Sequence, residues 1–128
     1  MKKTLVTSAT LVGSLGGVVG STVRLATPAH ADVERRGTCA GATDELGGDR
    51  ERGGFDVDAD IDGARPSSEW KVVIRHNGVV AVSRTVRADR EGELDVDTWR
   101  RNTAGADVFR LSVTPSGGNA CTVRAGMR

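Results

Sequence analysis

The stretch that decides the fold is Phe55-Asp56-Val57-Asp58-Ala59-Asp60-Ile61-Asp62. Apolar and acidic residues alternate strictly along it, so an extended chain has one apolar face and one acidic face here. A period of two is typical of a β-strand that buries one side, and no part of residues 32–128 sustains the 3.6-residue period of a helix. Residues 55–62 are therefore predicted to form a half-buried strand.

The segments that follow repeat this alternation. Inward faces are predicted for Trp70, Val72 and Ile74, for Val80, Val82 and Val86, for Leu94 and Val96, and for Phe109, Leu111 and Val113. Asn77-Gly78 separates two of these runs and is typical of a two-residue hairpin turn, because both residues tolerate a positive φ. With short strands around the two cysteines, the predicted fold class is all-β, a single β-sandwich of about seven strands.

Other parts of the chain are less regular. Residues 34–46 show the weakest pattern, and the charged residues 49–52 are expected to form a solvated loop. His76, beside the Asn-Gly turn, is expected to be exposed. Trp99 is expected to be buried, because one tryptophan adds much apolar area to a core with few aromatic residues, and an anchor for a partner is the alternative.

The first 31 residues have the features of a secretory signal peptide. Lys2 and Lys3 precede an apolar run, and Ala29-His30-Ala31 is a cleavage site of the small-x-small type. The alternative is a transmembrane anchor, which the glycines within the run make less favourable. We therefore expect residues 1–31 to be removed and residues 32–128 to form one secreted, extracellular domain that does not insert into a membrane.

Charge is balanced in the predicted mature chain. Residues 32–128 contain 15 Lys and Arg and 17 Asp and Glu, a net charge of −2. Binding to nucleic acid or to an anionic membrane needs a clustered basic face, which a weak mixed balance does not indicate. We expect an extracellular or cell-surface partner of unknown identity and no nucleic acid.

Cys39 and Cys121 lie near opposite ends of the predicted mature chain. Export brings them to an oxidising compartment, where a structural disulfide persists, so we expect them to pair; two free thiols are the alternative. A bridge closing a loop of this size stabilises a fold by about 4 kcal/mol in the chain-entropy model. It would tie the first strand to the last.

A resemblance to known sandwiches is carried by residues 70–78, Trp-Lys-Val-Val-Ile-Arg-His-Asn-Gly, and 105–111, Gly-Ala-Asp-Val-Phe-Arg-Leu. These segments resemble immunoglobulin-like and fibronectin type III-like domains, and more closely small secreted actinobacterial proteins of uncharacterised function. The resemblance implies that Trp70 packs in the core, and it implies a fold without an activity. The chain departs from the immunoglobulin pattern because it has no tyrosine and because its cysteines lie on the first and last strands.

One motif points to a ligand. Asp58-Ala59-Asp60-Ile61-Asp62-Gly63, followed after five residues by Glu69, matches the expression for an EF-hand calcium loop. Carboxylates at alternate positions are oxygen ligands that calcium prefers, but an EF-hand loop lies between helices, and both flanks here are predicted strands. Two interpretations remain: a solvated acidic strand face, or a weak calcium site of a different type formed by Asp58, Asp60 and Asp62.

No catalytic set can be assembled from the sequence. The motifs Ser-x-x-Lys, Gly-x-Ser-x-Gly and His-Glu-x-x-His do not occur. We therefore expect no enzyme, no catalytic residues and no cofactor apart from the calcium hypothesis. The predicted function is a secreted, non-enzymatic binding or structural module. The alternatives are a calcium-binding module that uses Asp58, Asp60 and Asp62, and a small secreted hydrolase.

Overall fold

The computed structural model describes residues 33–127, which form eight β-strands. In chain order they are β2 (Val33–Cys39), β3 (Ala42–Glu51), β4 (Gly54–Asp62), β5 (Glu69–His76), β6 (Val79–Arg87), β7 (Leu94–Arg101), β8 (Asp107–Pro115) and β9 (Cys121–Met127). The all-β prediction is confirmed, with one strand more than expected. Within the described range, no helix has the length and apolar character needed to cross a membrane. The predicted signal peptide, residues 1–31, lies outside the described residues.

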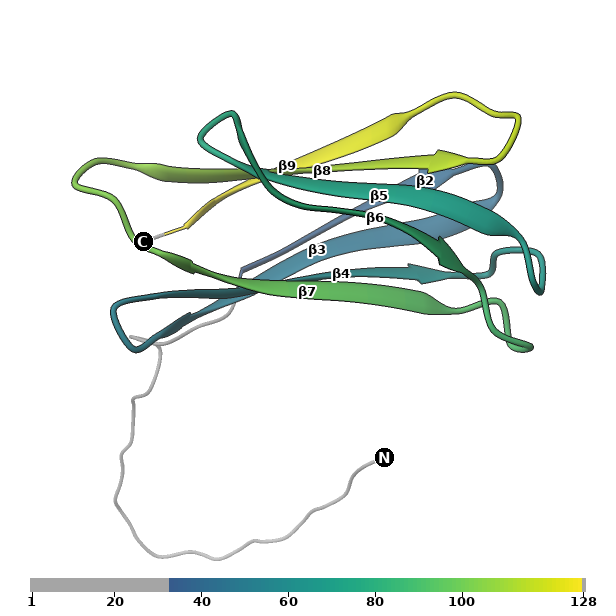
Figure 1. The fold of residues 1–128 in the computed structure, drawn as a ribbon, viewed down its shortest axis with the longest axis horizontal. Helices are drawn as coiled ribbons and strands as arrows, with labels where there is room; N and C mark the ends of the chain where they lie inside the picture. The colour runs from purple at the N-terminus through teal and green to yellow at the C-terminus, as the bar shows by residue number, and fades with distance from the viewer. Residues whose placement is uncertain (1–32, 128) are drawn as a thin grey trace, which may run out of the picture. The chain divides into compact units, whose positions relative to one another are not determined.

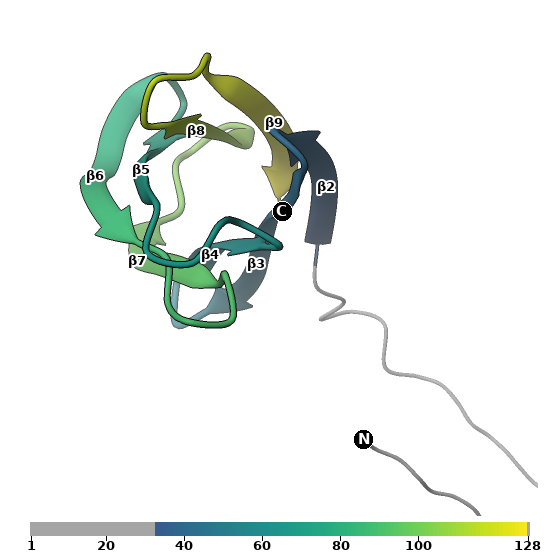
Figure 2. The ribbon, with the colours of Figure 1, turned by 90° about the vertical axis from the view of Figure 1, so that its right-hand side faces the viewer.

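The strands form two four-stranded antiparallel sheets that face each other (Figure 1). One sheet has the order β2-β3-β4-β7 and the other the order β6-β5-β8-β9. In the view along the strands, the two curved layers come together where β2 lies beside β9 (Figure 2). The predicted β-sandwich is the architecture observed.

Much of the core between the sheets consists of inward residues that the alternation predicts, and β3 and β9 add Ala42, Leu46, Ala125 and Met127. Ten of the predicted residues are at most 3% exposed: Phe55, Val57, Ala59 and Ile61 of β4, Trp70, Val72 and Ile74 of β5, and Phe109, Leu111 and Val113 of β8. The rings of Phe55 and Phe109 meet edge to face across the two sheets, with 5.9 Å between their centroids. Trp70 donates from Nε1 to the Ser68 hydroxyl at 3.0 Å, so its polar atom is satisfied as the indole packs.

The predicted inward face of β6 is correct for Val82 and Val86, which pack against the core, but wrong for Val80, which is 47% exposed. The register shifts between the pair Ile74 and Val82 and the pair Arg75 and Val80. The extra residue, a β-bulge at Ala81, turns Val80 to the outer surface.

Three hairpins turn through pairs of residues with positive φ. Asn77-Gly78 has φ values of 50° and 85°, which confirms the predicted turn. Ala40-Gly41 and Arg52-Gly53 adopt the same signs, with φ of 52° and 84° and of 49° and 76°. The turns at Ala40-Gly41 and Arg52-Gly53 join β2, β3 and β4 into one antiparallel unit. The weakly patterned residues 34–46 thus contribute to β2 and β3, and the prediction of a loop at 49–52 is wrong, because β3 extends to Glu51.

The disulfide between Cys39 and Cys121 is confirmed, with Cα atoms 5.8 Å apart. Cys39 ends β2 and Cys121 begins β9, and these are edge strands of different sheets. The bridge therefore ties the first strand to the last and holds the two sheets together along one side.

Reduction of this bridge should loosen the two edge strands before the centre of the sandwich. We expect backbone amides of β2 and β9 to exchange faster after reduction, while the β5-β6 hairpin keeps its protection, because β5 is bonded on both sides within its sheet. Hydrogen exchange of the oxidised and reduced protein, followed by mass spectrometry, measures this. A uniform loss of protection over all eight strands would contradict it.

Candidate functional site

The three aspartates of the calcium hypothesis, Asp58, Asp60 and Asp62, lie on the outer face of β4. Their apolar neighbours point into the core, so the strand sets the three side chains in a line. The strands on either side of β4 place further carboxylates next to this line. The resulting surface, called the acidic face below, consists of Glu45, Asp56, Asp58, Asp60, Asp62, Asp95 and Asp97.

Asp60 lies at the centre of the acidic face, directly opposite Glu45 on β3 and Asp95 on β7. Partial burial is the largest cause that raises its pKa, followed by a hydrogen bond with Asp58 and by the negative charges of Asp58, Asp95 and Glu45. Together they bring the pKa of Asp60 to about 7. This carboxyl group therefore changes its charge near neutral pH.

The acidic face has little compensation from cations. Among residues 33–127, its ion pairs are limited to one, between Glu45 Oε2 and Arg36 Nε at 3.0 Å. A hollow of about 390 Å³ opens at one end of the face. Six carboxylate residues line it: Glu45, Asp60, Asp62, Asp89, Glu93 and Asp95. Its chemistry suits a cation.

The EF-hand match does not produce EF-hand geometry. Glu69 begins β5 in the other sheet, and its carboxylate pairs with Arg87 Nη2 at 2.9 Å. Alternate residues of an extended strand are about 6.7 Å apart, so the backbone does not gather Asp58, Asp60 and Asp62 around one point. In the described part of the chain, no three metal-binding side chains are assembled for an ion. The calcium site stays a prediction.

His76 is 4% exposed, so the prediction that it is exposed is wrong. Its ring stacks on Phe109, with 4.4 Å between the centroids. Nε2 lies 2.6 Å from Asp107 Oδ1, and Arg100 Nε lies 3.4 Å from Nδ1. Because the arginine can only donate and the carboxylate accepts, the ring proton belongs on Nε2. The sequence contained the signal, since His76 continues the inward series of Trp70, Val72 and Ile74.

Asp107 is held from a second side by Thr103, in the loop between β7 and β8. The Thr103 amide and hydroxyl donate to its carboxylate at 3.0 and 2.9 Å. Burial alone would raise the pKa of Asp107, but the hydrogen bonds from His76 and Thr103 hold it below its ordinary value. With both ring nitrogens of His76 engaged and the ring buried, this pair anchors the β7-β8 loop and presents no free base to a substrate.

Trp99 is 42% exposed, so the prediction that it is buried is wrong. The alternation of β7 explains this, because Leu94 and Val96 point inward and an odd-numbered position points outward. The indole covers Gly54, where a Cβ would lie 2.6 Å from the ring, and its Nε1 donates to the Glu51 carbonyl at 3.1 Å. Trp99 thus packs over the turn between β3 and β4.

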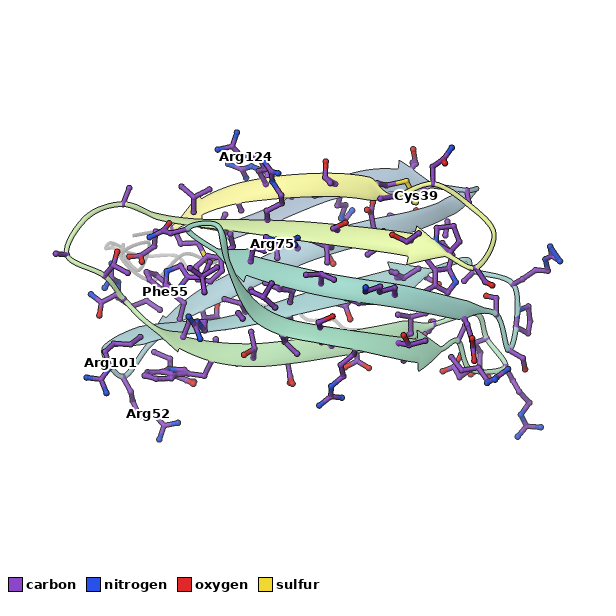
Figure 3. All side chains as sticks on the ribbon, turned by 45° about the horizontal axis from the view of Figure 1, so that its top comes forward. Cys39, Arg52, Phe55, Arg75, Arg101 and Arg124 are labelled. Atoms are coloured by element: carbon purple, nitrogen blue, oxygen red, sulfur yellow. A yellow bond between two sulfur atoms is a disulfide. The ribbon has the colours of Figure 1, made fainter. Side chains whose placement is uncertain are left out.

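The outer face of the second sheet carries positive charge. Arg75 of β5 is directly opposite Arg110 of β8, which is directly opposite Arg124 of β9, and we call these three the arginine row. Figure 3 shows Arg75 and Arg124 on this sheet. No side-chain hydrogen bond or ion pair links any of the three to another residue of 33–127, where the ion pairs are Arg36 to Glu45, Arg87 to Glu69 and His76 to Asp107. The two outer faces therefore carry opposite charges.

The raised pKa of Asp60 predicts how stability changes with pH. The folded state holds this proton up to about pH 7, whereas the unfolded chain releases it near its ordinary pKa, so Asp60 lowers stability progressively as pH rises from about 4 to 7. Asp60→Asn removes that cost, and we expect it to stabilise the fold at pH 8 by about 1–2 kcal/mol. Urea unfolding at pH 5 and pH 8 measures the difference.

Asp62 is exposed on the same strand, so Asp62→Asn is the matched control. It should change the free energy of unfolding by no more than about 0.5 kcal/mol. Parallel pH profiles for wild type and Asp60→Asn would contradict the assignment.

Comparison with known proteins adds no relative to this description. No protein-family model matches the chain, and neither the curated proteins nor the solved structures contain a significant match. The sequence resembles immunoglobulin-like and fibronectin type III-like sandwiches, and the structure supports this resemblance only in its pair of packed antiparallel sheets.

Proposed function

We propose that this chain is a secreted, non-enzymatic, immunoglobulin-like sandwich, of the kind found in small actinobacterial exported proteins, that binds an extracellular or cell-surface partner through its charged outer faces. The observation that carries the proposal is the segregation of charge between the two sheets. Like charges directly opposite each other destabilise a sheet, so the acidic face and the arginine row cost stability in the isolated chain. A partner of opposite charge removes that cost.

Two further observations support the proposal. The disulfide between Cys39 and Cys121 is of a kind that persists in an oxidising compartment, in agreement with the predicted export. The buried pair of His76 and Asp107 is saturated with hydrogen bonds, which argues against the alternative of a small hydrolase.

The test separates the two faces. Oxidised wild type and two neutralised variants are used to capture partners from cell-envelope extracts: Asp58→Asn/Asp60→Asn/Asp95→Asn for the acidic face, and Arg75→Gln/Arg110→Gln/Arg124→Gln for the arginine row. We expect one variant to lose a partner that the other retains, because a charged interface recognises its partner by complementarity. Mass spectrometry identifies the captured material.

Arg84→Gln is the control, because it removes one exposed charge from the same sheet outside the row. Equal capture by all four proteins would refute a role for either face.

Calcium binding is the second candidate, and the crowding around Asp60 favours it. A divalent cation beside Asp58 and Asp60 would neutralise the repulsion that raises the pKa of Asp60. A site with a dissociation constant of about 10⁻⁴–10⁻³ M would stabilise the fold by about 1 kcal/mol in millimolar calcium. For a domain of this size, that raises the melting temperature by about 4–8 °C.

Thermal melts at pH 8 in millimolar calcium and in chelator measure this shift, and Asp60→Asn should abolish it. Superimposable melts of the wild type would remove calcium from consideration.

A further inference from the structure

The arginine row is a compact group of cations. Directly opposed side chains on antiparallel strands have Cβ atoms about 5 Å apart, so the three arginines lie within about 10 Å across the sheet. They line a hollow of about 370 Å³ together with Asn77, Gly78 and Val108. The rim of this hollow is fixed, because Asn77 Nδ2 donates to the Ala106 carbonyl at 3.1 Å and Asn77 Oδ1 accepts from the Val108 amide at 2.8 Å.

We propose that the arginine row binds linked phosphate groups, each arginine facing an oxyanion of the ligand. A guanidinium offers a planar fork of donors that fits a phosphate through two parallel hydrogen bonds. Three arginines in line, two of them exposed and Arg75 half-buried, leave these donors free on an open surface. The ligand is recognised along its charged backbone, and the hollow at the Asn77-Gly78 turn receives one end of it.

Phosphate fits the row better than a carboxylate does. Three adjacent positive charges without a counter-charge require more negative charge than one carboxylate supplies, whereas linked phosphate groups carry at least one negative charge each and present acceptor oxygens in series. The lining of the hollow contains no aromatic side chain on which a nucleic-acid base could stack. The inference is therefore confined to the phosphate groups of the ligand.

This inference rests on the proposed function, because the arginine row is one of the two faces given a binding role there. It names the chemistry that this face recognises. A row that still captures an envelope partner, while no phosphate probe binds it, would refute the phosphate assignment and leave the binding module standing.

The experiment titrates the oxidised full chain with orthophosphate, tripolyphosphate and vesicles of phosphatidylcholine with or without phosphatidylglycerol. We expect tripolyphosphate to bind, to raise the melting temperature and to bind more weakly as salt increases. Arg110→Gln removes the central arginine and should weaken binding by about tenfold or more. Tripolyphosphate binding that is tighter than orthophosphate binding supports the row as a site for linked phosphate groups. Binding to phosphatidylglycerol vesicles alone, whose headgroups each carry one unlinked phosphodiester, would overturn it.

Arg84→Gln is again the matched control and should bind as the wild type does. Arg110→Gln should melt no lower than the wild type, since it relieves repulsion within the row, so a loss of binding cannot be attributed to unfolding. Absence of binding to every probe, or an equal loss in Arg84→Gln and Arg110→Gln, would overturn the proposal.

Discussion

Every strand of this small sandwich has to bury one face against the opposite sheet, and the other features follow from that constraint. Seven strands supply buried core residues and β6 packs the partly buried Val82 and Val86 against them, so most of the charged residues that alternate with these positions are forced onto two outer surfaces. Strand register then decides which charges become neighbours. Asp60 meets Glu45 and Asp95, while Arg110 meets Arg75 and Arg124. A chain of balanced composition thus acquires two surfaces of opposite sign.

Where alternation is strict, the sequence predicts the fold well. β4, β5 and β8 can be predicted from the sequence because their apolar residues fall on one face without interruption. The turn at Asn77-Gly78 can be predicted because both residues accept its positive φ values. β3 cannot be predicted in this way, because two of its inward positions hold no apolar side chain. Asp44 takes an inward position, where both carboxylate oxygens are buried without a hydrogen-bond partner of good geometry and burial raises the pKa of Asp44, partly offset by nearby backbone amides. Gly48 takes another inward position of β3, where the side chain of Met127 from β9 fills the space that a larger residue would need.

The candidate sites depend on contacts between strands, which a linear motif does not contain. The EF-hand expression groups Asp58, Asp60 and Asp62 with Glu69 by spacing, yet Glu69 belongs to the other sheet and pairs with Arg87. The neighbours that raise the pKa of Asp60 come from β3, β4 and β7. The arginine row likewise joins three strands. Its members could be assigned to outer faces from the sequence, but their alignment required the register.

Net charge is therefore a poor guide to the charge that each outer surface of this protein carries. A net charge near zero argued against a basic surface. The total hides the separation of charge between the acidic face on one sheet and the arginine row on the other. The separation also has a thermodynamic consequence. Each like-charged pair directly across a sheet costs up to about 1 kcal/mol, and the disulfide offsets several such pairs with about 4 kcal/mol. A covalent tie between edge strands thus lets a domain of this size keep two repulsive faces, which remain available to ligands of opposite charge.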